Sequence, residues 1–475
     1  MSANPKDTLN FLESFKQFRH PRSLGDTGLS VSPFGFGSYR VLDSVAAHKA
    51  ALNQSLAGGV NLIDTSSNYS DGASEKLIGQ ALREGINLNH FTREQMVVVS
   101  KVGYVQGSAL KEMKHRKSNS KTIKDMVEFH PQAWHCIHPE YIDYSIEQSL
   151  SRLGVSSLDV YLLHNPEYYF KESADHGDYY KRIKLAFEHL ESLVDQGKIS
   201  FYGISSNTFP SSSNSGDFTS LEKCLELAKS IKENHHFRVV QMPVNLIENS
   251  AFTENNNDSM SAIAFAQKNN LAVLGNRPFN AFRQDQLVRL VSFAKHDEAV
   301  IKGRLHTELQ QLIAHEREFE QISKLPQEVA WGQNLRDHLQ EITDSIEWRE
   351  ILNQQILPIY QDAIQKLPPS EEIRAWRSAH QKKLYQLLST LTQNYENQSA
   401  IVSDHVKAQI LDACPKVDPK RTLSQIVLQL YLASPGVSSM LVGMRNPTYV
   451  GDVLDTPLDL DLNQDELKQV FSQIR

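Results

Sequence analysis

Short, continuously apolar segments recur along this chain, and each is followed by a segment with helical periodicity. Eight of these runs are expected to be buried strands, at residues 34–37, 60–63, 96–100, 158–163, 199–204, 239–244, 271–275 and 438–442. Parallel strands that are covered on both faces read as continuous apolar runs. Eight strands alternating with eight helices predict an α/β protein with a TIM (β/α)8 barrel. The alternative is a doubly wound sheet, which the lack of a Gly-x-Gly-x-x-Gly turn after the first strand disfavours.

The alternation breaks once, between about residue 283 and residue 420, where no strand is expected. This segment is rich in Gln, Glu, Lys, His and Leu with helical spacing, and prolines divide it into several helices. It falls between the seventh strand and the seventh helix, which is a loop at the catalytic end of a barrel. The expected organisation is an N-terminal arm (1–21), a first barrel part (22–282), a large all-helical insertion on the catalytic face (283–420), and the last βα units with a C-terminal helix (421–475).

The composition limits the classes of partner and location. The chain has 475 residues and a net charge of −7, so it lacks the basic surplus typical of nucleic-acid-binding proteins. Its three cysteines are widely spaced and form no metal-ligand pattern, which favours a reducing, cytoplasmic location and disfavours a metal site. It contains no apolar run long enough to cross a membrane, and its first residues do not form a secretory signal.

Polar side chains stand where the expected strands end. Asp64 follows the second strand, Lys101 the third and His164 the fourth, while Tyr69 lies in the loop after Asp64. Each alone has an ordinary explanation, as a turn residue, a loop phenol, a solvated lysine or a hydrogen-bonded core histidine. Because the carboxyl ends of barrel strands meet on one face, the four are expected to converge there.

This set suits proton donation to a carbonyl as a hydride arrives. Tyr69 would be the general acid, and the Lys101 ammonium would lower its pKa from the ordinary value of about 10. Asp64 would pair with Lys101 and keep it charged, and His164 would orient the carbonyl oxygen and donate to its developing negative charge. The hydride must come from a cofactor, since no side chain supplies one.

At these residues the chain resembles the aldo/keto reductases. The matching segments are Leu24–Ser32, Asn61-Leu-Ile-Asp-Thr-Ser-Ser-Asn-Tyr69, Val98-Val-Ser-Lys101, Leu162-Leu-His-Asn-Pro166, Lys198–Ser205 and Ser434–Gly443. The resemblance covers about residues 22–282 and 421–455. It implies the TIM barrel and a nicotinamide dinucleotide, usually NADP, with NAD also open, bound without a Rossmann domain.

The resemblance also implies which residues hold that cofactor. Gln241 and Ser205 or Ser206 match the positions that bind the nicotinamide carboxamide, and Asn207 lies one step beyond the commonest Ser-Asn pair. The remaining candidates are Arg277 for the pyrophosphate, with a surface salt bridge as its alternative, Gly443 in the segment that grips the adenosine phosphate, and Arg445 for the 2′-phosphate. Asn276 stands where many members place a Tyr that stacks on the nicotinamide, and Asp452 and Val453 replace the usual adenine-binding Glu and Asn.

The sequence therefore predicts an oxidoreductase that transfers a hydride between a nicotinamide cofactor and an aldehyde, ketone or sugar carbonyl. The alternative is a regulatory or interaction protein on the same scaffold, which uses the insertion to bind a partner. We expect the insertion to pack against the long connection after Lys101 and to narrow access to Tyr69. A passive appendage or an oligomer contact is the alternative for that segment. The substrate, the direction of the reaction and the oligomeric state stay open.

Overall fold

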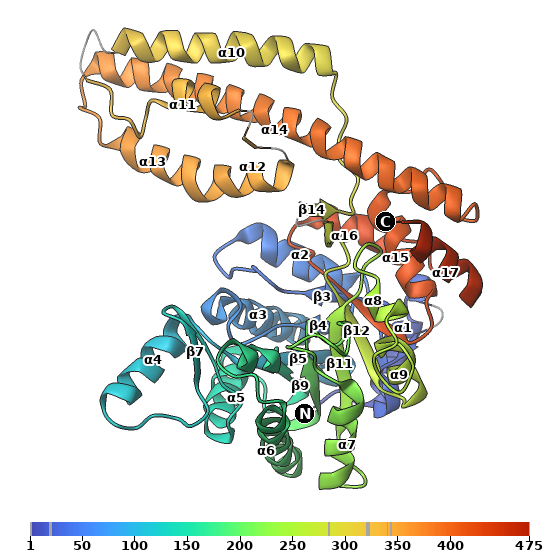
Figure 1. Ribbon diagram of the computed structural model, residues 1–475. Helices are drawn as coiled ribbons and strands as arrows, with labels where there is room; N and C mark the ends of the chain where they lie inside the picture. The colour runs from blue at the N-terminus through green and yellow to red at the C-terminus, as the bar shows by residue number, and fades with distance from the viewer. Residues whose placement is uncertain are drawn as a thin grey trace. The chain divides into compact units, whose positions relative to one another are not determined.

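The computed structural model describes residues 2–18, 21–283, 286–319, 324–339, 341–342 and 344–474. The chain forms two compact units (Figure 1). Unit 1 comprises Met1–Leu287 and Ala413–Arg475, and unit 2 comprises Val288–Asp412. Unit 2 is therefore inserted into unit 1.

A closed barrel of eight parallel strands forms the centre of unit 1, so the predicted fold class is confirmed. The strands follow one another around the barrel in chain order, and the last pairs with the first. They are β3 (Phe34–Gly37), β4 (Leu62–Asp64), β5 (Val97–Val102), β9 (Leu158–His164), β10 (Ile199–Ser205), β11 (Phe237–Pro243), β12 (Ala272–Asn276) and β15 (Val437–Val442). Apolar side chains of alternate positions, among them Val97, Val160 and Leu274, fill the barrel interior.

The strand register brings the expected polar side chains to one end of the barrel. Asp64 is opposite Val99 on β5, and Lys101, two residues further on, is opposite Leu162. His164 and Ser205 are opposite each other, and Ser205 is also opposite Gln241. All of these residues lie at or near the carboxyl ends of their strands, where barrel enzymes carry their chemistry.

Helices follow the strands and form the outer layer of the barrel (Figure 1). Each buries an apolar stripe, as Leu77, Ile78 and Ala81 do on the second of them. Side-chain caps begin several of these helices, for example the Thr422–Gln425 capping box. The helices are α2 (Ala46–Ala57), α3 (Ala73–Asn87), α5 (Pro139–Leu153), α6 (His176–Asp195), α7 (Leu221–Ile231), α9 (Ala262–Lys268), α15 (Leu423–Ala433) and α16 (Pro447–Leu454), with α8 (Ser250–Thr253) and α17 (Gln464–Gln473) as additions.

The N-terminal segment forms a helix and a hairpin. Helix α1 (Pro5–Glu13) is capped by Asn4, and a hairpin forms between β1 (Arg22–Ser23) and β2 (Ser30–Val31), around the Asp-Thr-Gly turn of the sequence. Leu24, Leu29 and Val31 from this hairpin belong to the same apolar cluster as the interior side chains of the strands. The hairpin therefore contributes directly to the barrel core.

The long connection after β5 is more ordered than its polar sequence indicates. It contains helix α4 (Gly107–Ser118) and a three-stranded antiparallel sheet of β6 (Tyr104–Val105), β7 (Val127–His130) and β8 (Ala133–His135). Lys114 and Lys117 of α4 both lie over the ring of Trp134. The sequence predicted none of these elements. The strands have only two to four residues, which are too few to show a period, and α4 buries only Leu110 and Met113, so it shows no apolar stripe.

Unit 2 has an apolar core of its own. Its helices are α10 (Glu298–Phe319), α11 (Trp331–His338), α12 (Ser345–Ile351), α13 (Leu357–Gln365) and α14 (Glu371–Ala413), with a π-helical turn at Leu352–Ile356 before α13. The core joins the predicted leucine faces, including Leu309, Leu312, Leu384, Leu387 and Leu391, to Trp348. The helical spacing of the sequence predicts that Ile322 lies on the same face as Leu309 and Leu312, but Ile322 falls outside the described residues.

The expectation of no strand between residues 283 and 420 is wrong at one point. Strand β14 (Gln286–Arg289) pairs with β13 (Asn280–Arg283). Only four residues long, β14 gave too little alternation to stand out from the polar segment around it. The expected position of unit 2 over Tyr69 stays a prediction.

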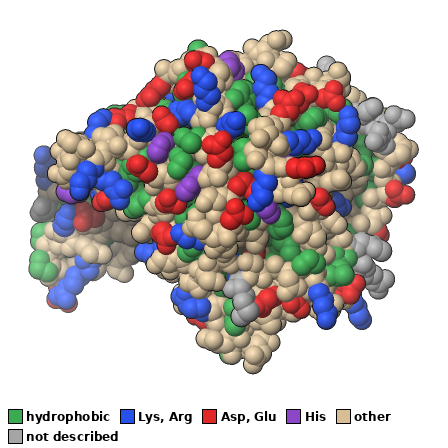
Figure 2. Space-filling model, turned by 90° about the horizontal axis from the view of Figure 1, so that it is seen from below, with side chains coloured by type: hydrophobic (Ala, Val, Ile, Leu, Met, Phe, Trp, Pro, Cys, Tyr) green, Lys and Arg blue, Asp and Glu red, His purple; other side chains and the backbone are tan. Residues whose placement is uncertain are grey.

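Charged groups are mixed on the surface. On the face that Figure 2 shows, Lys and Arg side chains are interspersed with Asp and Glu side chains and not gathered by sign. Within the part of the chain that the structure describes, no helix is long and apolar enough to cross a membrane.

Candidate active site

Lys101 and Asp64 form a buried ion pair at the carboxyl ends of β5 and β4. The Lys101 Nζ lies 2.7 Å from Asp64 Oδ2, and the lysine is 0 % exposed. Nζ also donates to the Thr65 carbonyl at 2.9 Å. Burial lowers the pKa of Lys101, but Asp64 and Tyr69 more than offset this, so the pKa lies above its ordinary value. The lysine is therefore an ammonium at neutral pH.

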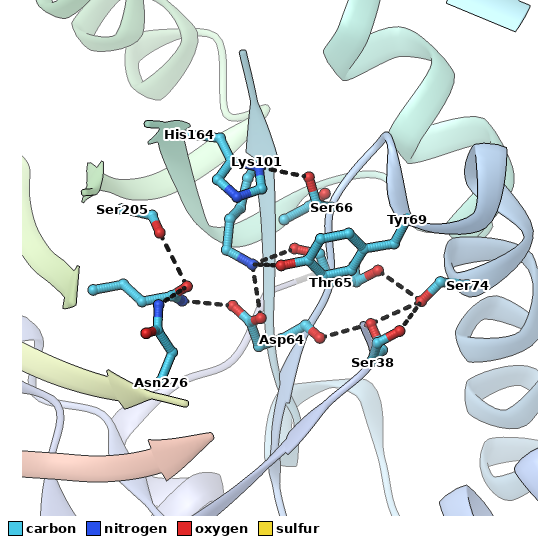
Figure 3. A network of polar contacts seen from close by, with 12 residues as sticks. Ser38, Asp64, Thr65, Ser66, Tyr69, Ser74, Lys101, His164, Ser205 and Asn276 are labelled. Carbon is cyan, nitrogen blue, oxygen red and sulfur yellow. Dashed lines mark hydrogen bonds and ion pairs between the residues drawn. The ribbon is translucent and has the colours of Figure 1, made fainter. Parts of the chain in front are cut away.

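Tyr69 completes the contacts of that ammonium. Lys101 Nζ donates to the Tyr69 hydroxyl at 3.3 Å, and it lies 4.9 Å from the centre of the ring (Figure 3). Burial raises the pKa of Tyr69 and Lys101 opposes it, with a net rise above 10. The prediction that Lys101 brings this pKa below its ordinary value is therefore wrong, because desolvation of the phenolate outweighs the nearby charge. Tyr69 is a protonated phenol, which is the form of a proton donor.

An unusual turn follows Tyr69, and the connection after β5 holds this turn in place. Directly after Tyr69, Ser70 and Asp71 both have left-handed backbone, with φ of 51° and 52°, which non-glycine residues seldom adopt. Asp71 Oδ1 accepts hydrogen bonds from the backbone N–H and the hydroxyl of Ser108, at the first turn of α4. The long connection after β5 thus fixes the turn beside Tyr69, the candidate general acid.

His164 lies against Tyr69 at the end of β9. The two rings are 6.0 Å apart and nearly perpendicular, and the Tyr104 ring packs edge-on against His164 at 4.8 Å. His164 Nδ1 is 3.1 Å from the Ser66 hydroxyl, as Figure 3 shows. Burial, then Lys101 and His135, lower the pKa of His164 well below 6.5. The imidazole is therefore neutral at physiological pH.

Small hydroxyl side chains hold the backbone around Asp64. The Ser38 hydroxyl donates to the Asp64 carbonyl at 2.8 Å, and Ser74 donates to Ser38 at 2.7 Å (Figure 3). The Thr65 hydroxyl is 3.1 Å from that of Ser74. These buried contacts tie β3, β4 and the start of α3 together, so the strand that presents Asp64 is joined to the helix that follows the Tyr69 loop.

Gln241 extends the network to the next strands. Its Nε2 donates to Asp64 Oδ1 at 2.8 Å, while its Oε1 accepts from the Ser205 hydroxyl at 3.0 Å and from Asn276 Nδ2 at 3.3 Å. Asp64 thus receives Lys101 on one oxygen and Gln241 on the other. An amide nitrogen carries two hydrogens, so one N–H of Gln241 is left for a ligand.

Ser206 and Asn207 follow Ser205 beyond the end of β10. The Ser206 hydroxyl accepts from the backbone N–H of Thr208 at 3.1 Å. The Asn207 backbone N–H donates to Glu167 Oε1 at 2.8 Å, and the Asn207 side chain is exposed. Glu167 was not anticipated from the sequence, because a carboxylate that binds a backbone N–H has no sequence signature.

The remaining cofactor candidates follow β12 and β15. Arg277, directly after β12, has left-handed backbone, with φ of 54°. Gly443 is exposed, and a Cβ built there meets no atom within 4 Å. Burial lowers the pKa of Arg445, and so does the nearby Arg40. The half-buried Asp452 carboxylate accepts hydrogen bonds from the hydroxyl groups of Thr422 and Ser424, so both of its oxygens have partners within the protein.

Two buried polar atoms at the end of β12 lack hydrogen-bond partners among the described residues, and they show whether these residues could bind a nicotinamide dinucleotide. The Asn276 Oδ1 and the Arg277 Nε are buried and have no hydrogen-bond partner in the described part of the chain. Such groups are costly unless a ligand or water satisfies them. An amide acceptor beside a guanidinium donor matches a carboxamide and a phosphate, so the residues fit the cofactor.

A model of the aldo/keto reductase family matches residues 35–299, which is more than half of the chain. The chain belongs to the aldo/keto reductase family. The match begins in β3 and includes the ion pair, Tyr69, His164 and the Gln241 network. This is an oxidoreductase family, and its members bind nicotinamide cofactors.

Two curated relatives match the chain over part of its length. An Escherichia coli K12 protein named NADH-specific methylglyoxal reductase is 30% identical over 153 residues, which cover 30% of this chain and 40% of that protein. The aldo-keto reductase YhdN of Bacillus subtilis 168 is 26% identical over 193 residues, which cover 38% and 46%. The chain thus spans less than half the length of these curated relatives. The solved holo form of aldo-keto reductase AKR11C1 from Bacillus halodurans is 15% identical, with 96% of both chains covered and a TM-score of 0.47.

Proposed function

We propose that this chain is an NAD(P)-dependent oxidoreductase that interconverts an aldehyde, ketone or sugar carbonyl and its alcohol, with Tyr69 as general acid and base. One observation carries the proposal. The buried Lys101 ammonium donates both to Asp64 and to the Tyr69 hydroxyl. A structural ion pair needs only the first of these contacts, whereas proton delivery needs both.

The proton step follows from these contacts. As the carbonyl carbon gains a hydride, its oxygen takes the proton of the Tyr69 hydroxyl, and the electron pair of that O–H bond stays on the phenolate oxygen. The N–H of Lys101 then donates to the phenolate, while Asp64 keeps the lysine charged. Because burial holds the pKa of Tyr69 above 10, the proton leaves only for a strongly basic, alkoxide-like oxygen. Alcohol oxidation follows the same steps in reverse.

Bound nicotinamide dinucleotide would supply or accept the hydride. The residues proposed to hold it are Ser205, Ser206, Asn207, Gln241, Arg277, Gly443 and Arg445. NADP is favoured because no acidic side chain in the described part of the chain forms an ion pair with Arg445 or with its neighbour Arg40. Two unpaired guanidinium groups suit a phosphate. NAD stays the alternative, since the Escherichia coli relative is named as NADH-specific.

A cytoplasmic location is part of the proposal. Cys136, Cys224 and Cys414 are all buried and unbridged, which suits a reducing compartment. The proposed substrate, a small carbonyl compound, would then reach the site from the cytoplasm.

The test is the oxidation of NADPH and of NADH with a panel of aldehydes and ketones. The wild type is compared with Tyr69→Phe, which keeps the ring but has no proton to give. Tyr39→Phe is the matched control, because Tyr39 packs on the Tyr69 ring at 5.3 Å but is 60% exposed. We expect Tyr69→Phe to lose at least ~100-fold in kcat, the usual contribution of a general acid. Equal rates of NADPH or NADH oxidation for wild type and Tyr69→Phe would refute the proposal.

A further inference from the structure

A second cavity lies in the outer, helical layer of unit 1, where α15 and α16 pack beside each other (Figure 1). Its volume is about 520 Å³, which is within the range of small-molecule sites. None of the residues that line it is proposed above for catalysis or for the cofactor. Its polar lining comes from the segment before α15, from α15 itself and from the segment after α16, and consists of Lys416, Asp418, Arg421, Gln429, Asp459 and Asp461.

The Gln429 amide is buried at this cavity and makes no hydrogen bond. Gln429 follows Gln425 by one helical turn, so both side chains lie on the same side of α15. The protein uses the Gln425 amide, whose Nε2 donates to the Asp452 carbonyl at 3.0 Å. Gln429 is 7% exposed, its Oε1 is buried without a partner, and no described residue accepts a hydrogen bond from its Nε2. A buried amide of this kind is costly unless a ligand or water satisfies it.

The two basic side chains of the cavity already have partners. Lys416 Nζ lies 2.7 Å from Glu466 Oε1, and it also donates to the Asp461 carbonyl at 3.2 Å. Arg421 Nε lies 3.6 Å from Asp418 Oδ2. Both positive charges are therefore matched by a carboxylate of the protein, and neither calls for an anionic ligand.

Two carboxylates of the cavity have no such partner. Asp459 and Asp461 are exposed, and neither carboxylate forms an ion pair within the part of the chain that the structure describes. The charge left over in the cavity is negative, so it complements a cation. Exposed carboxylates alone attract a cation only weakly in water. The buried Gln429 amide supplies what they lack, a directional contact away from solvent.

An organic ammonium matches these groups better than a metal ion does. Ca²⁺ takes about six to eight oxygen ligands, and within the described residues no three acidic, His or Cys side chains converge to hold a metal. A primary ammonium has only three N–H donors, which carboxylate and amide oxygens can accept. Because no hydrogen bond holds the Gln429 amide, it can turn about its last side-chain torsion and present its oxygen to the cavity. The match thus holds for either orientation of the amide.

We propose that this cavity binds a small primary alkylammonium compound, held by Gln429 Oε1 together with Asp459 or Asp461. The ammonium brings the missing positive charge and satisfies the buried amide. A quaternary ammonium of equal charge has no N–H to donate, so it cannot take its place. The site lies apart from the proposed reaction, so it is tested independently of the function proposed above.

The first test is titration calorimetry of the full chain at low ionic strength. The probe is putrescine, a linear alkyl diamine, and its control is the same diamine fully methylated on both nitrogens, which keeps the charges but has no N–H. We expect saturable binding of putrescine and at least about tenfold weaker binding of the methylated compound. Equal affinities would mean attraction by charge alone, and tighter binding of Ca²⁺ would mean a metal site. Either result, or the absence of saturable putrescine binding, overturns the proposal.

The second test assigns the binding to the cavity. Gln429→Leu removes the amide, and the double variant Asp459→Asn with Asp461→Asn removes the charge. Each should weaken putrescine binding by about tenfold. Asp455→Asn is the matched control and should bind as the wild type does, because it removes an exposed carboxylate of the same segment that does not line the cavity.

Gln429→Leu also removes an unsatisfied buried group, so it should fold at least as stably as the wild type, which unfolding in urea checks. Wild-type affinity for putrescine in folded Gln429→Leu overturns the role of the amide. An unchanged affinity in the double variant, or an equal loss in Asp455→Asn, overturns the site.

Discussion

Glu167 offers a stability test that does not depend on the substrate. This carboxyl lies in the 3-10 helix Pro166–Lys171 after β9, is 6% exposed, and accepts the Asn207 N–H with one oxygen. Its Oε2 is buried without a hydrogen-bond partner in the described chain. Burial raises the pKa of Glu167 from 4.5 to about 7, although the N–H donors oppose the rise.

The sign of the pH effect follows from proton uptake. Between pH 4.5 and 7 the folded chain keeps a proton on Glu167 that the unfolded chain has lost, so stability falls as the pH rises. At 1.36 kcal/mol per pKa unit, the free energy of unfolding falls by about 2.5 kcal/mol between pH 5 and pH 8.5. Glu167→Gln cannot ionise but keeps an acceptor for Asn207. The variant should therefore gain about 2.5 kcal/mol relative to the wild type over this range.

The assay is unfolding in urea at both pH values, monitored by hydrogen exchange of the β9 and β10 amides. These strands report on unit 1 and not on unit 2. Glu188→Gln, an exposed carboxylate on α6, is the control and should track the wild type. If the difference between Glu167→Gln and wild type changes by less than about 0.5 kcal/mol between pH 5 and pH 8.5, as for an ordinary surface change, the reasoning about Glu167 is refuted.

Three further predictions address the ion pair, the cofactor and unit 2. Lys101→Met leaves Asp64 buried without its partner and should lower the free energy of unfolding by about 3–5 kcal/mol, measured by urea denaturation. An unchanged free energy of unfolding would mean that the ion pair is not buried in solution. Arg445→Gln should weaken NADPH binding about tenfold and leave NADH binding nearly unchanged, measured by fluorescence titration; equal losses for both would remove the 2′-phosphate role. Leu391→Ala, fully buried in unit 2, should cost about 2–5 kcal/mol, measured by hydrogen exchange in α14; unchanged protection there would contradict the described core.

The barrel could be predicted because its strands are buried on both faces. A continuous β-branched run such as Val97–Val99 has few alternatives to a parallel strand, and eight such runs at regular spacing leave few topologies. The sheet of β6, β7 and β8 and strand β14 were missed. Each has only two to four residues, and pairing between distant segments, not local pattern, stabilises them.

In the candidate site, too, some features could be predicted from the sequence and others could not. Strand ends in a barrel converge by geometry, so Asp64, Lys101 and His164 could be found by position, and Tyr69 by its loop. The sign of the Tyr69 pKa shift could not, because it depends on how far burial outweighs Lys101. The contacts of Gln241 with Ser205 and Asn276 likewise depend on which atom donates to which, and a sequence does not specify that.

The proton delivered by Tyr69 is the central claim, and a single-turnover measurement tests it most directly. The enzyme is loaded with NADPH, whose affinity is measured separately by fluorescence, and is then mixed with excess aldehyde while NADPH absorbance is followed. For Tyr69→Phe we predict an NADPH affinity close to that of the wild type and a rate of NADPH oxidation at least ~100-fold lower. NADPH oxidation by Tyr69→Phe at the wild-type rate, with cofactor bound equally well, would contradict the account.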